Sequence, residues 1–315
     1  MHKRASCPVQ VGTVQLGGGA PVAIQSMTNT DTRDVDATVA QILRLEAAGC
    51  EIVRAAVFDE DCARALGAIR RRIHIPLVAD VHFSSKLAIA AIENGADKLR
   101  INPGNIGSEA RVAEVVAAAK DHGTPIRVGV NSGSLEKQLL NRYGGPTPEA
   151  LAESALGEVA LLERLGFSNI VIAIKASPVT DNVAANRIAA ARVNYPFHLG
   201  VTEAGTAYEG ALRSAVGIGT LLMEGIGDTI RVSLSGDPAP EVEAARIILQ
   251  AAGLRGGVHV VSCPTCGRCG IDVAGIAQEV TAALRALDSD LKVAVMGCVV
   301  NGPGEARECD VGIAG

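Results

Sequence analysis

The fold is decided by a stretch that reads KLRINPGNIGSEARVAEVVAAAKDHGTPIRVGVNSG, residues 98–133. Residues 98–104 favour a β-strand, residues 108–123 have a helical pattern, and residues 126–133 favour a second β-strand. The helical segment closes on a glycine, the residue preferred just past a helix end because it tolerates a positive φ. A strand, a helix and a second strand in this order predict a βα unit of a parallel sheet.

The same alternation recurs along most of the chain. Further strand candidates are residues 21–27, 51–57, 76–83, 170–177, 197–205 and 229–236. Helical stretches such as 35–49 lie between them. Eight strands with helical crossovers match the strand count of a (β/α)8 TIM barrel, which we predict for residues 1–253. An open doubly wound sheet is the alternative, although no G-x-G-x-x-G motif opens a helix after the first strand.

Two segments depart from this regular alternation. Residues 132–148, between the fifth and sixth strands, are typical of an added loop or short helix. After the eighth strand a last helix over 241–253 is followed by Leu-Arg-Gly-Gly at 254–257, which we interpret as a linker. Residues 258–315 have a smaller βαβ-like pattern, with a helix over 274–287, and predict a small α+β domain.

The composition excludes some classes of partner. Aromatic residues make up 2% of the chain, tryptophan is absent and the formal net charge is −5. Base stacking needs aromatic rings and a phosphate backbone needs a basic surface, so we expect no nucleic-acid partner. No apolar run approaches the roughly 18 residues that span a bilayer, so we expect no membrane span. Eight cysteines without a secretory signal predict the reducing cytoplasm, with Cys50 and Cys62 as small buried side chains.

Basic residues interrupt five of the eight predicted strands. They are Arg54, Arg100, Arg127, Lys175 and Arg231. In a parallel barrel the carboxyl ends of the strands form the active-site face. Five cations at one barrel mouth, in a chain of net charge −5, predict an anionic ligand with two or more phosphate-type groups held by Arg forks.

Other polar side chains fall on the same face of the predicted barrel. They are Asp80, His82, Asn102, Asn131, Glu203 and Ser233. A carboxylate among several arginines is either a counter-ion or a general acid or base, and both interpretations stay open for Glu203. His82 is either functional or a hydrogen-bonded core histidine. These residues predict an anion-binding barrel but do not name a reaction.

The end of the chain carries clustered cysteines, in VSCPTCGRCGIDV at 261–273 and GCVVNGPGEARECD at 297–310. A C-x2-C pair with a distant cysteine fits an iron–sulfur cluster better than a structural zinc, which needs a closed set of four ligands. The spacing favours Cys263, Cys266, Cys298 and, as the fourth ligand, Cys269. Glu305 and Cys309 are the other candidates for the fourth position.

Eight longer motifs carry a family resemblance. They are PVAIQSMTNTDT (21–32), PLVADVHF (76–83), LRINPGNIG (99–107), VNSGSLEK (130–137), LGVTEAG (199–205), GIGDTIRVSL (225–234), CPTCGR (263–268) and GCVVNGPGEA (297–306). In this order they resemble the bacterial 4-hydroxy-3-methylbut-2-en-1-yl diphosphate synthases, iron–sulfur enzymes of the methylerythritol phosphate route to isoprenoids. The resemblance implies a TIM barrel followed by a cluster domain, in a homodimer in which the cluster of one subunit caps the barrel mouth of the other.

The resemblance also implies a reaction. It is the two-electron reductive opening of 2-C-methyl-D-erythritol 2,4-cyclodiphosphate with loss of water, with ferredoxin or flavodoxin as electron donor. The five cations, Asn131 and Ser233 would hold the diphosphate and hydroxyl groups. Asp80 and His82 would line the same pocket, and Glu203 would help a hydroxyl leave as water.

For the metal, the family pattern is three thiolates and one carboxylate on a [4Fe-4S] cluster. It carries over to Cys263, Cys266, Cys298 and Glu305, in place of Cys269. A carboxylate binds cluster iron more weakly than a thiolate, so one iron can open to substrate. Cys269 and Cys309 depart from the pattern, and the resemblance implies a tail beyond the last residue of this chain. The alternative function is a zinc-thiolate or pteridine-dependent TIM-barrel transferase.

Overall fold

Eight parallel strands form a closed ring in the computed structural model, which describes residues 3–284, 287, 289–300 and 302–315. The strands are β3 (Ala23–Met27), β4 (Ile52–Ala56), β5 (Leu77–Asp80), β6 (Lys98–Ile101), β7 (Ile126–Asn131), β8 (Ile170–Lys175), β9 (His198–Leu199) and β10 (Thr229–Ile230). Their order in the sheet is β8-β7-β6-β5-β4-β3-β10-β9. A parallel bridge between Ile172 and Phe197 joins β8 to the start of β9 and closes the ring. The predicted (β/α)8 barrel is confirmed, and the open doubly wound sheet is wrong.

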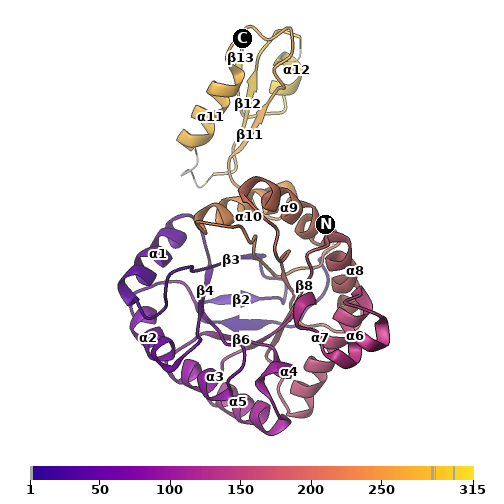
Figure 1. The fold of residues 1–315 in the computed structure, drawn as a ribbon. Coiled ribbons are helices and arrows are strands. Elements are labelled where there is room, and N and C mark those ends of the chain that lie inside the picture. Colours follow the sequence, from indigo (N-terminus) through magenta and orange to yellow (C-terminus); the bar gives the residue numbers. More distant parts are fainter. Residues whose placement is uncertain (1–2, 285–286, 288, 301) are drawn as a thin grey trace. The chain divides into compact units, whose positions relative to one another are not determined.

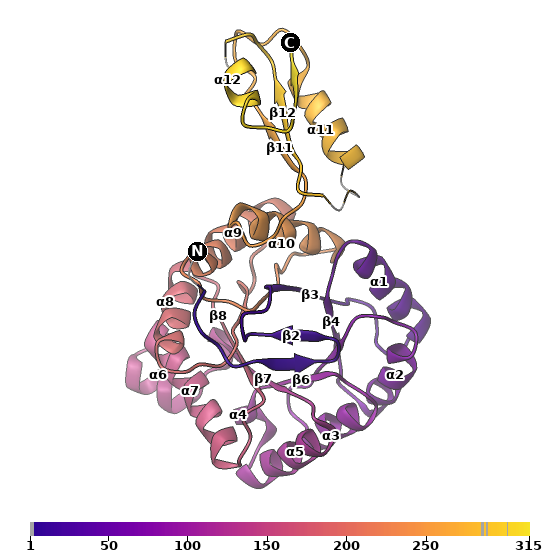
Figure 2. The same ribbon diagram turned by 180° about the vertical axis from the view of Figure 1, so that it is seen from behind.

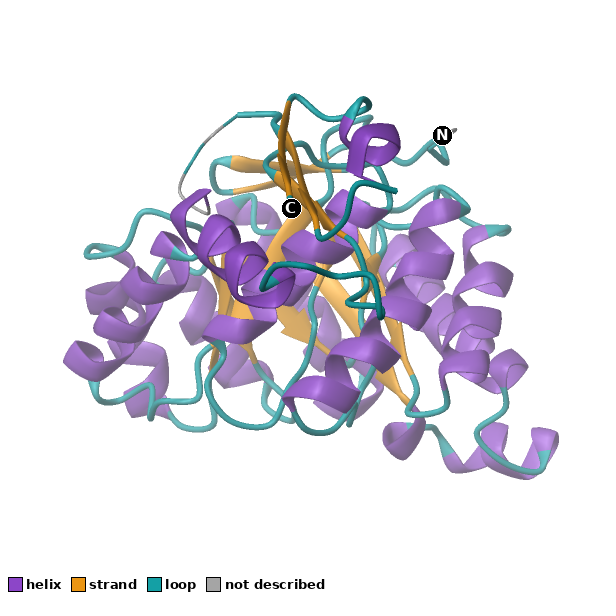
Figure 3. Ribbon diagram, turned by 90° about the horizontal axis from the view of Figure 1, so that it is seen from above, coloured by secondary structure: helices purple, strands orange, loops and turns teal. Residues whose placement is uncertain are grey.

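Helices cover the outside of the barrel, one or more after each strand (Figures 1 and 3). The long ones are α1 (Val35–Ala47), α2 (Glu60–Arg70), α3 (Ser85–Glu93), α5 (Glu109–His122), α7 (Pro148–Arg164), α8 (Val179–Ala190), α9 (Ala207–Met223) and α10 (Ala239–Ala251). Short polar side chains begin several of them, because a side-chain oxygen satisfies an amide that has no partner in the first turn. Asp34, Asp59 and Thr147 do this for α1, α2 and α7.

Three short helical pieces lie at the carboxyl end of the barrel. They are α4 (Pro103–Ile106), the 3-10 turn η1 (Ser132–Ser134) and α6 (Lys137–Tyr143). The last two fill the irregular segment between the fifth and sixth barrel strands, where the sequence predicts an added loop or short helix. These pieces shape the rim of the barrel mouth.

A hairpin that the sequence did not predict closes the other end of the barrel. Its strands β1 (Val9–Val11) and β2 (Val14–Leu16) are antiparallel and lie across the barrel end in Figure 2. Apolar hairpin side chains pack against residues of the first halves of barrel strands. The cluster consists of Val9, Val11, Leu16, Ala23, Ile52, Val78 and Val171. The hairpin covers the amino ends of the strands, so the carboxyl ends are left for a ligand.

The chain divides into two units, the first ending at Ala252 and the second running from Gly253 to Gly315. The second unit has a parallel sheet of β11 (His259–Ser262), β12 (Lys292–Met296) and β13 (Val311–Ala314), in that order. Helices α11 (Val273–Leu284) and α12 (Gly302–Ala306) connect these strands. The predicted β-helix-β pattern is present, and β13 adds a third strand that the sequence did not predict. Its four residues alternate Val-Gly-Ile-Ala and are exposed, so they lack the apolar run of a buried strand.

Candidate functional site

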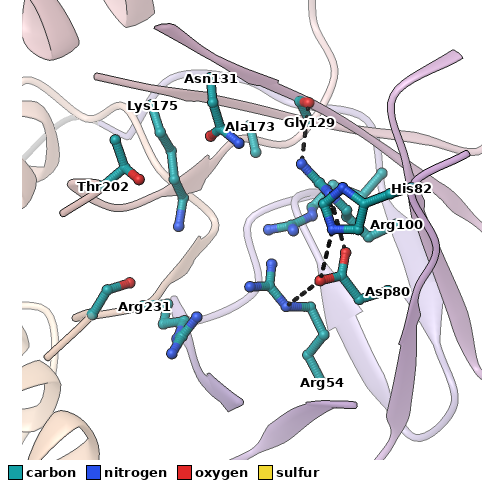
Figure 4. Close-up of a pocket in the computed structure, with 12 residues that line it drawn as sticks. Arg54, Asp80, His82, Arg100, Gly129, Asn131, Ala173, Lys175, Thr202 and Arg231 are labelled. Atoms are coloured by element: carbon teal, nitrogen blue, oxygen red, sulfur yellow. Dashed lines mark hydrogen bonds and ion pairs between the residues drawn. The ribbon is translucent and has the colours of Figure 1, made fainter. Parts of the chain in front are cut away.

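A cavity of about 160 Å³ opens at the carboxyl end of the barrel. Side chains from separate strands point into it (Figure 4). It is lined by Arg54, Asp80, His82, Arg100, Arg127, Gly129, Asn131, Ala173, Lys175, Thr202, Arg231 and Ser233. All seven residues predicted to bind the substrate are among them, together with Asp80 and His82. Lys175 and Arg231 lie at or just past the carboxyl ends of β8 and β10, whereas Arg54, Arg100 and Arg127 lie within β4, β6 and β7. The barrel brings their side chains together because all five line the same cavity.

Asp80 is the counter-ion on one side of the cavity. Its carboxylate lies 3.2 Å from Arg100 Nη1, 3.7 Å from Arg54 Nε and 3.5 Å from His82 Nε2. Burial alone would raise the pKa of Asp80, but the charges of Arg54 and Arg100 and the hydrogen bond with His82 hold it well below its usual range. Asp80 is therefore ionised at neutral pH.

Two cations in the cavity, Arg127 and Lys175, form no ion pair with any carboxylate of the described residues. Arg127 is buried, and its Nε and Nη1 have no hydrogen-bond partner in the part of the chain that the structure describes. Burial, and then repulsion by neighbouring arginines, lower the pKa of Arg127 well below its usual value. The pKa of Lys175 is lowered by burial and by the charge of Arg127 in the same way. Burial and repulsion disfavour the charged forms of Arg127 and Lys175, and a bound anion would stabilise both charges.

Glu241 is the second counter-ion, and the sequence did not predict it. It stands in the first turn of α10, buried, and its Oε1 lies 3.0 Å from Arg231 Nη2. Among the cavity cations and the two carboxylates that pair with them, five positive charges face two negative ones. The excess of positive charge matches an anionic ligand carrying at least two charges.

Two glycines leave room for the cations. A Cβ on Gly129 would lie 2.6 Å from Arg100 Nε. A Cβ on Gly200 would lie 2.7 Å from Lys175 Nζ and 2.8 Å from the carbonyl oxygen of Arg231. Glycine is required where the backbone of one strand approaches a neighbouring side chain this closely. Each glycine interrupts an apolar strand in the sequence, which is the signal that could have revealed this role.

Glu203 and Asn102 lie outside the cavity lining. Glu203 is exposed on the loop after β9, next to Thr202, and its φ of 52° is in the left-handed region. Its Oε2 accepts a hydrogen bond of 2.9 Å from Ser177 Oγ. Asn102 is buried directly after β6. The sequence groups both with the barrel mouth, and the structure brings neither into contact with the cavity.

A second cavity, of about 100 Å³, lies in the second unit. It is lined by Cys263, Pro264, Cys266, Arg268, Met296, Gly297 and Cys298. Cys263 follows β11 and Cys298 lies just past β12, so two adjacent parallel strands carry two of the thiols at their carboxyl ends. The backbone amide of Gly297 donates to Cys263 Sγ at 3.2 Å and fixes the position of this sulfur in the cavity.

The three lining thiols fit a [4Fe-4S] cluster. Among the described residues, no three His, Cys, Asp or Glu side chains converge as ligands of one metal ion do. The ligands of a [4Fe-4S] cluster bind separate irons at the corners of a cube, so thiols spread around one cavity are the arrangement it needs. Glu305 belongs to α12, and its side chain lies outside the described residues.

Cys269, the fourth ligand that spacing favours, is not part of this cavity lining. Its thiol donates to the carbonyl oxygen of Ile271 at 3.1 Å. Cys309 is also absent from the lining. Elsewhere, Cys50 and Cys62 are buried as predicted, and burial raises the pKa of the Cys50 thiol to about 12.

The fold and its two cavities define a (β/α)8 barrel protein with a cavity lined by cations and a second unit with a cavity lined by cysteines. Residues 6–246 match the family described as GcpE TIM-barrel domain, and residues 259–315 match the GcpE protein C-terminal domain. The chain belongs to the GcpE family. The resemblance stated from the sequence is confirmed, and a zinc-thiolate or pteridine-dependent transferase is not favoured.

Close relatives carry one name. The 4-hydroxy-3-methylbut-2-en-1-yl diphosphate synthase (flavodoxin) of Caldanaerobacter subterraneus subsp. tengcongensis is 59% identical over 308 residues, which cover 98% of this chain and 87% of the relative. The enzyme of the same name from Clostridium perfringens is 57% identical over 316 residues, covering 100% of this chain and 90% of the relative.

Solved structures of other proteins resemble part of this chain. Dihydropteroate synthase from Stenotrophomonas maltophilia superposes with a TM-score of 0.58 at 15% identity, over 79% of this chain and 98% of that one. This likeness supports the fold and carries no functional argument. Within the described residues, no helix combines the length and apolar character needed to cross a membrane.

Proposed function

We propose that this chain catalyses the reductive ring opening and dehydration of 2-C-methyl-D-erythritol 2,4-cyclodiphosphate to 4-hydroxy-3-methylbut-2-enyl diphosphate. It acts as an iron–sulfur oxidoreductase that takes up two electrons and two protons and releases water. The names of its relatives support this reaction. The observation that carries it is the cavity in which five cations face only two paired carboxylates, because a cyclic diphosphate supplies the missing negative charge.

The barrel residues bind and orient the substrate. Arg127 and Lys175, which form no ion pair within the described part of the chain, contact phosphate oxygens directly, and Arg54, Arg100 and Arg231 complete the diphosphate site. Asn131 and Ser233 line the same cavity and offer hydrogen bonds to hydroxyl groups. Because the arginines are held by Asp80 and Glu241 before the ligand arrives, little reorganisation is needed on binding.

Glu203 is the acid that protonates the leaving hydroxyl, and Asp80 with His82 lines the pocket near the reacting groups. Glu203 stands next to Thr202, a residue of the cavity lining. Its left-handed backbone conformation costs free energy, and such strain is concentrated at functional positions. Its hydrogen bond with Ser177 fixes the carboxyl group on the rim.

Residues 1–253 form the substrate-binding domain and 258–315 the cluster domain, joined by a linker at 254–257. Cys263, Cys266, Cys298 and Glu305 hold the [4Fe-4S] cluster, which supplies the electrons for ring opening when it is bound. The cavity shared by the three cysteines supports this ligand set. A carboxylate from Glu305 would be a weaker ligand than a thiolate, so this position of the bound cluster would be the one open to chemistry.

The electron donor is flavodoxin or ferredoxin, and flavodoxin is part of the relatives' printed names. The protein works in the cytoplasm as a homodimer in which the cluster of one subunit serves the barrel of the other. Mixing two inactive variants tests this arrangement, one altered at Arg127 and one at Cys266. A heterodimer regains one intact pair of sites, so activity returns on mixing, whereas a self-sufficient monomer regains none.

The reaction is tested by anaerobic reconstitution followed by a product assay with the cyclodiphosphate. Wild type forms the linear diphosphate. Arg127→Met keeps its iron and loses most turnover, and Glu305→Ala keeps the fold and loses most turnover. Cys269→Ser keeps the iron and sulfide content of wild type, while Cys266→Ser loses it. Absence of product from reconstituted wild type overturns the reaction, and loss of the cluster in Cys269→Ser overturns the ligand set.

A further inference from the structure

Three oxygen-bearing side chains converge beside Gly104, outside the cavity lining. Measured from the position that a Cβ would take on Gly104, Asn102 Oδ1 lies at 3.2 Å, Glu158 Oε1 at 3.3 Å and Glu136 Oε1 at 3.6 Å. Asn102 follows β6, Glu136 precedes α6 and Glu158 lies on α7. Three segments distant in sequence thus bring three acceptor oxygens close to one place.

These acceptors are short of donors. Asn102 and Glu158 are 3% and 5% exposed, and Asn102 Oδ1, Glu158 Oε2 and Glu136 Oε2 are buried with no hydrogen-bond partner in the described residues. The remaining carboxylate oxygens accept from the Gly104 amide at 3.3 Å and from Ser154 Oγ at 3.0 Å. Buried acceptors without a donor cost free energy, so such a group requires a partner.

Arg100, whose charge acts on Glu158, does not supply that partner. The hydrogen bonds of Arg100 go to Asp80, His82 and the carbonyl oxygen of Gly129. In the described part of the chain no Lys or Arg forms an ion pair with Glu136 or Glu158. Burial raises the pKa of Glu158 to about 8, and the charge of Glu136 acts in the same direction. When both carboxylates are ionised they repel each other, so the pair requires either a proton or a cation.

A single proton and a cation satisfy the site differently. A proton on Glu158 gives one O–H donor, which bridges to one acceptor and leaves another buried acceptor without a partner. A metal ion accepts lone pairs from all three side chains at once. Two carboxylates and one amide oxygen balance a charge of +2, and hard oxygen ligands without thiol or imidazole select magnesium-like ions over zinc or iron.

We propose that Asn102, Glu136 and Glu158 bind a hard divalent cation of the Mg²⁺ class. The ion completes its coordination with water, as Mg²⁺ does when one or two carboxylates hold it. It ties the segments after β6 and β7 to α7. Since Arg100 and Asn131 lie on those two strands, the ion fixes the rim of the anion cavity without touching its ligand.

Mn²⁺ serves as the probe, because it shares the oxygen preference of Mg²⁺ and is observed by electron paramagnetic resonance. The holoenzyme is titrated with Mn²⁺ without substrate, and the free Mn²⁺ signal is followed. Wild type binds one ion per chain. Glu158→Gln and Glu136→Gln each weaken this binding by more than the roughly 10–100-fold typical of losing an outer-shell partner. Glu149→Gln, at an exposed position on α7, binds as wild type does.

Thermal unfolding gives an independent readout. Mg²⁺ raises the Tm of wild type, because a ligand that binds only the folded state stabilises it by mass action. The rise disappears in both Gln variants and persists in Glu149→Gln. The proposal is overturned if wild type binds no Mn²⁺, or if Glu158→Gln and Glu136→Gln bind it as tightly as wild type. A Tm of wild type that responds to pH and not to Mg²⁺ also overturns it, since a shared proton then fills the site.

Discussion

Arg231 and Glu241 form a bidentate ion pair at the barrel mouth. Nε and Nη2 of Arg231 lie 3.1 and 3.0 Å from Oε2 and Oε1 of Glu241. The same carboxylate accepts from Ser26 Oγ at 2.9 Å and from the Leu234 amide at 3.0 Å. Glu241 is 2% exposed, so its negative charge is balanced by protein groups and not by solvent. It connects β3, the loop after β10 and α10, and it orients Arg231 toward the anion cavity.

Glu241→Gln leaves the shape of this side chain and removes its charge. We expect the free energy of unfolding to fall by about 3 kcal/mol, because a buried guanidinium loses its counter-ion. Urea unfolding checks this. The matched control is Glu60→Gln, whose carboxylate lies 3.6 Å from Arg64 at the surface and whose loss changes stability little. Equal stability of Glu241→Gln and wild type would show that Arg231 needs no counter-ion.

Lys175→Met changes stability and binding in opposite directions. The methionine removes a buried cation that no described carboxylate pairs with, so the unliganded protein gains about 1 kcal/mol or more. Binding of inorganic pyrophosphate weakens about 10–100-fold, since a hydrogen bond to a charged group contributes roughly 1.5–3 kcal/mol. Urea unfolding and titration calorimetry measure the two effects. Lys137→Met, at an exposed position on α6, alters neither. A less stable Lys175→Met would contradict the uncompensated charge.

Anion binding also depends on pH through Lys175. Burial, and then the charge of Arg127, hold its pKa well below the usual 10.5 in the unliganded protein. A bound diphosphate raises this pKa, so the complex takes up a proton. Affinity is therefore full below the unliganded pKa and falls by up to about tenfold per pH unit as the pH rises above it. Pyrophosphate titrations of wild type and Lys175→Met between about pH 6 and 10 isolate this dependence from the ionisation of pyrophosphate itself. Parallel pH curves for the two proteins would rule it out.

The barrel was predictable because its strands are short apolar runs separated by helical patterns of the right length. All eight predicted strand ranges contain an observed strand. The closing hairpin was missed because β1 and β2 have three residues each, too few for a periodic signal. Their burial comes from packing against Ile52 and Val78, which lie far away in the sequence. Local patterns do not contain that information.

The cations of the site were predictable for a similar reason. An Arg or Lys inside an apolar strand is conspicuous, and the barrel topology turns five of them toward one cavity. Their partner Glu241 was not conspicuous, because a glutamate in the first turn of an amphipathic helix normally faces solvent and favours the helix dipole. Glu158, in the interior of α7, was missed because a glutamate in an amphipathic helix normally faces solvent. For Cys269 the spacing and the family resemblance differ: regular C-x2-C spacing favours it as the fourth ligand, and the resemblance implies Glu305 instead. In the structure the Cys269 thiol donates to the carbonyl oxygen of Ile271.

Glu203 combines a strained backbone with a proposed catalytic carboxyl group, and two substitutions separate these properties. Its φ of 52° costs a side-chain-bearing residue about 1 kcal/mol, which glycine does not incur. Glu203→Gly therefore raises the free energy of unfolding by about 1 kcal/mol, while Glu203→Gln, which keeps the side chain, leaves it near wild type. Both variants lose most turnover of the cyclodiphosphate, because neither carries an acidic proton. Urea unfolding and the product assay distinguish the effects. Turnover retained in Glu203→Gln would remove the residue from the chemistry, and a less stable Glu203→Gly would mean that the hydrogen bond to Ser177 outweighs the strain.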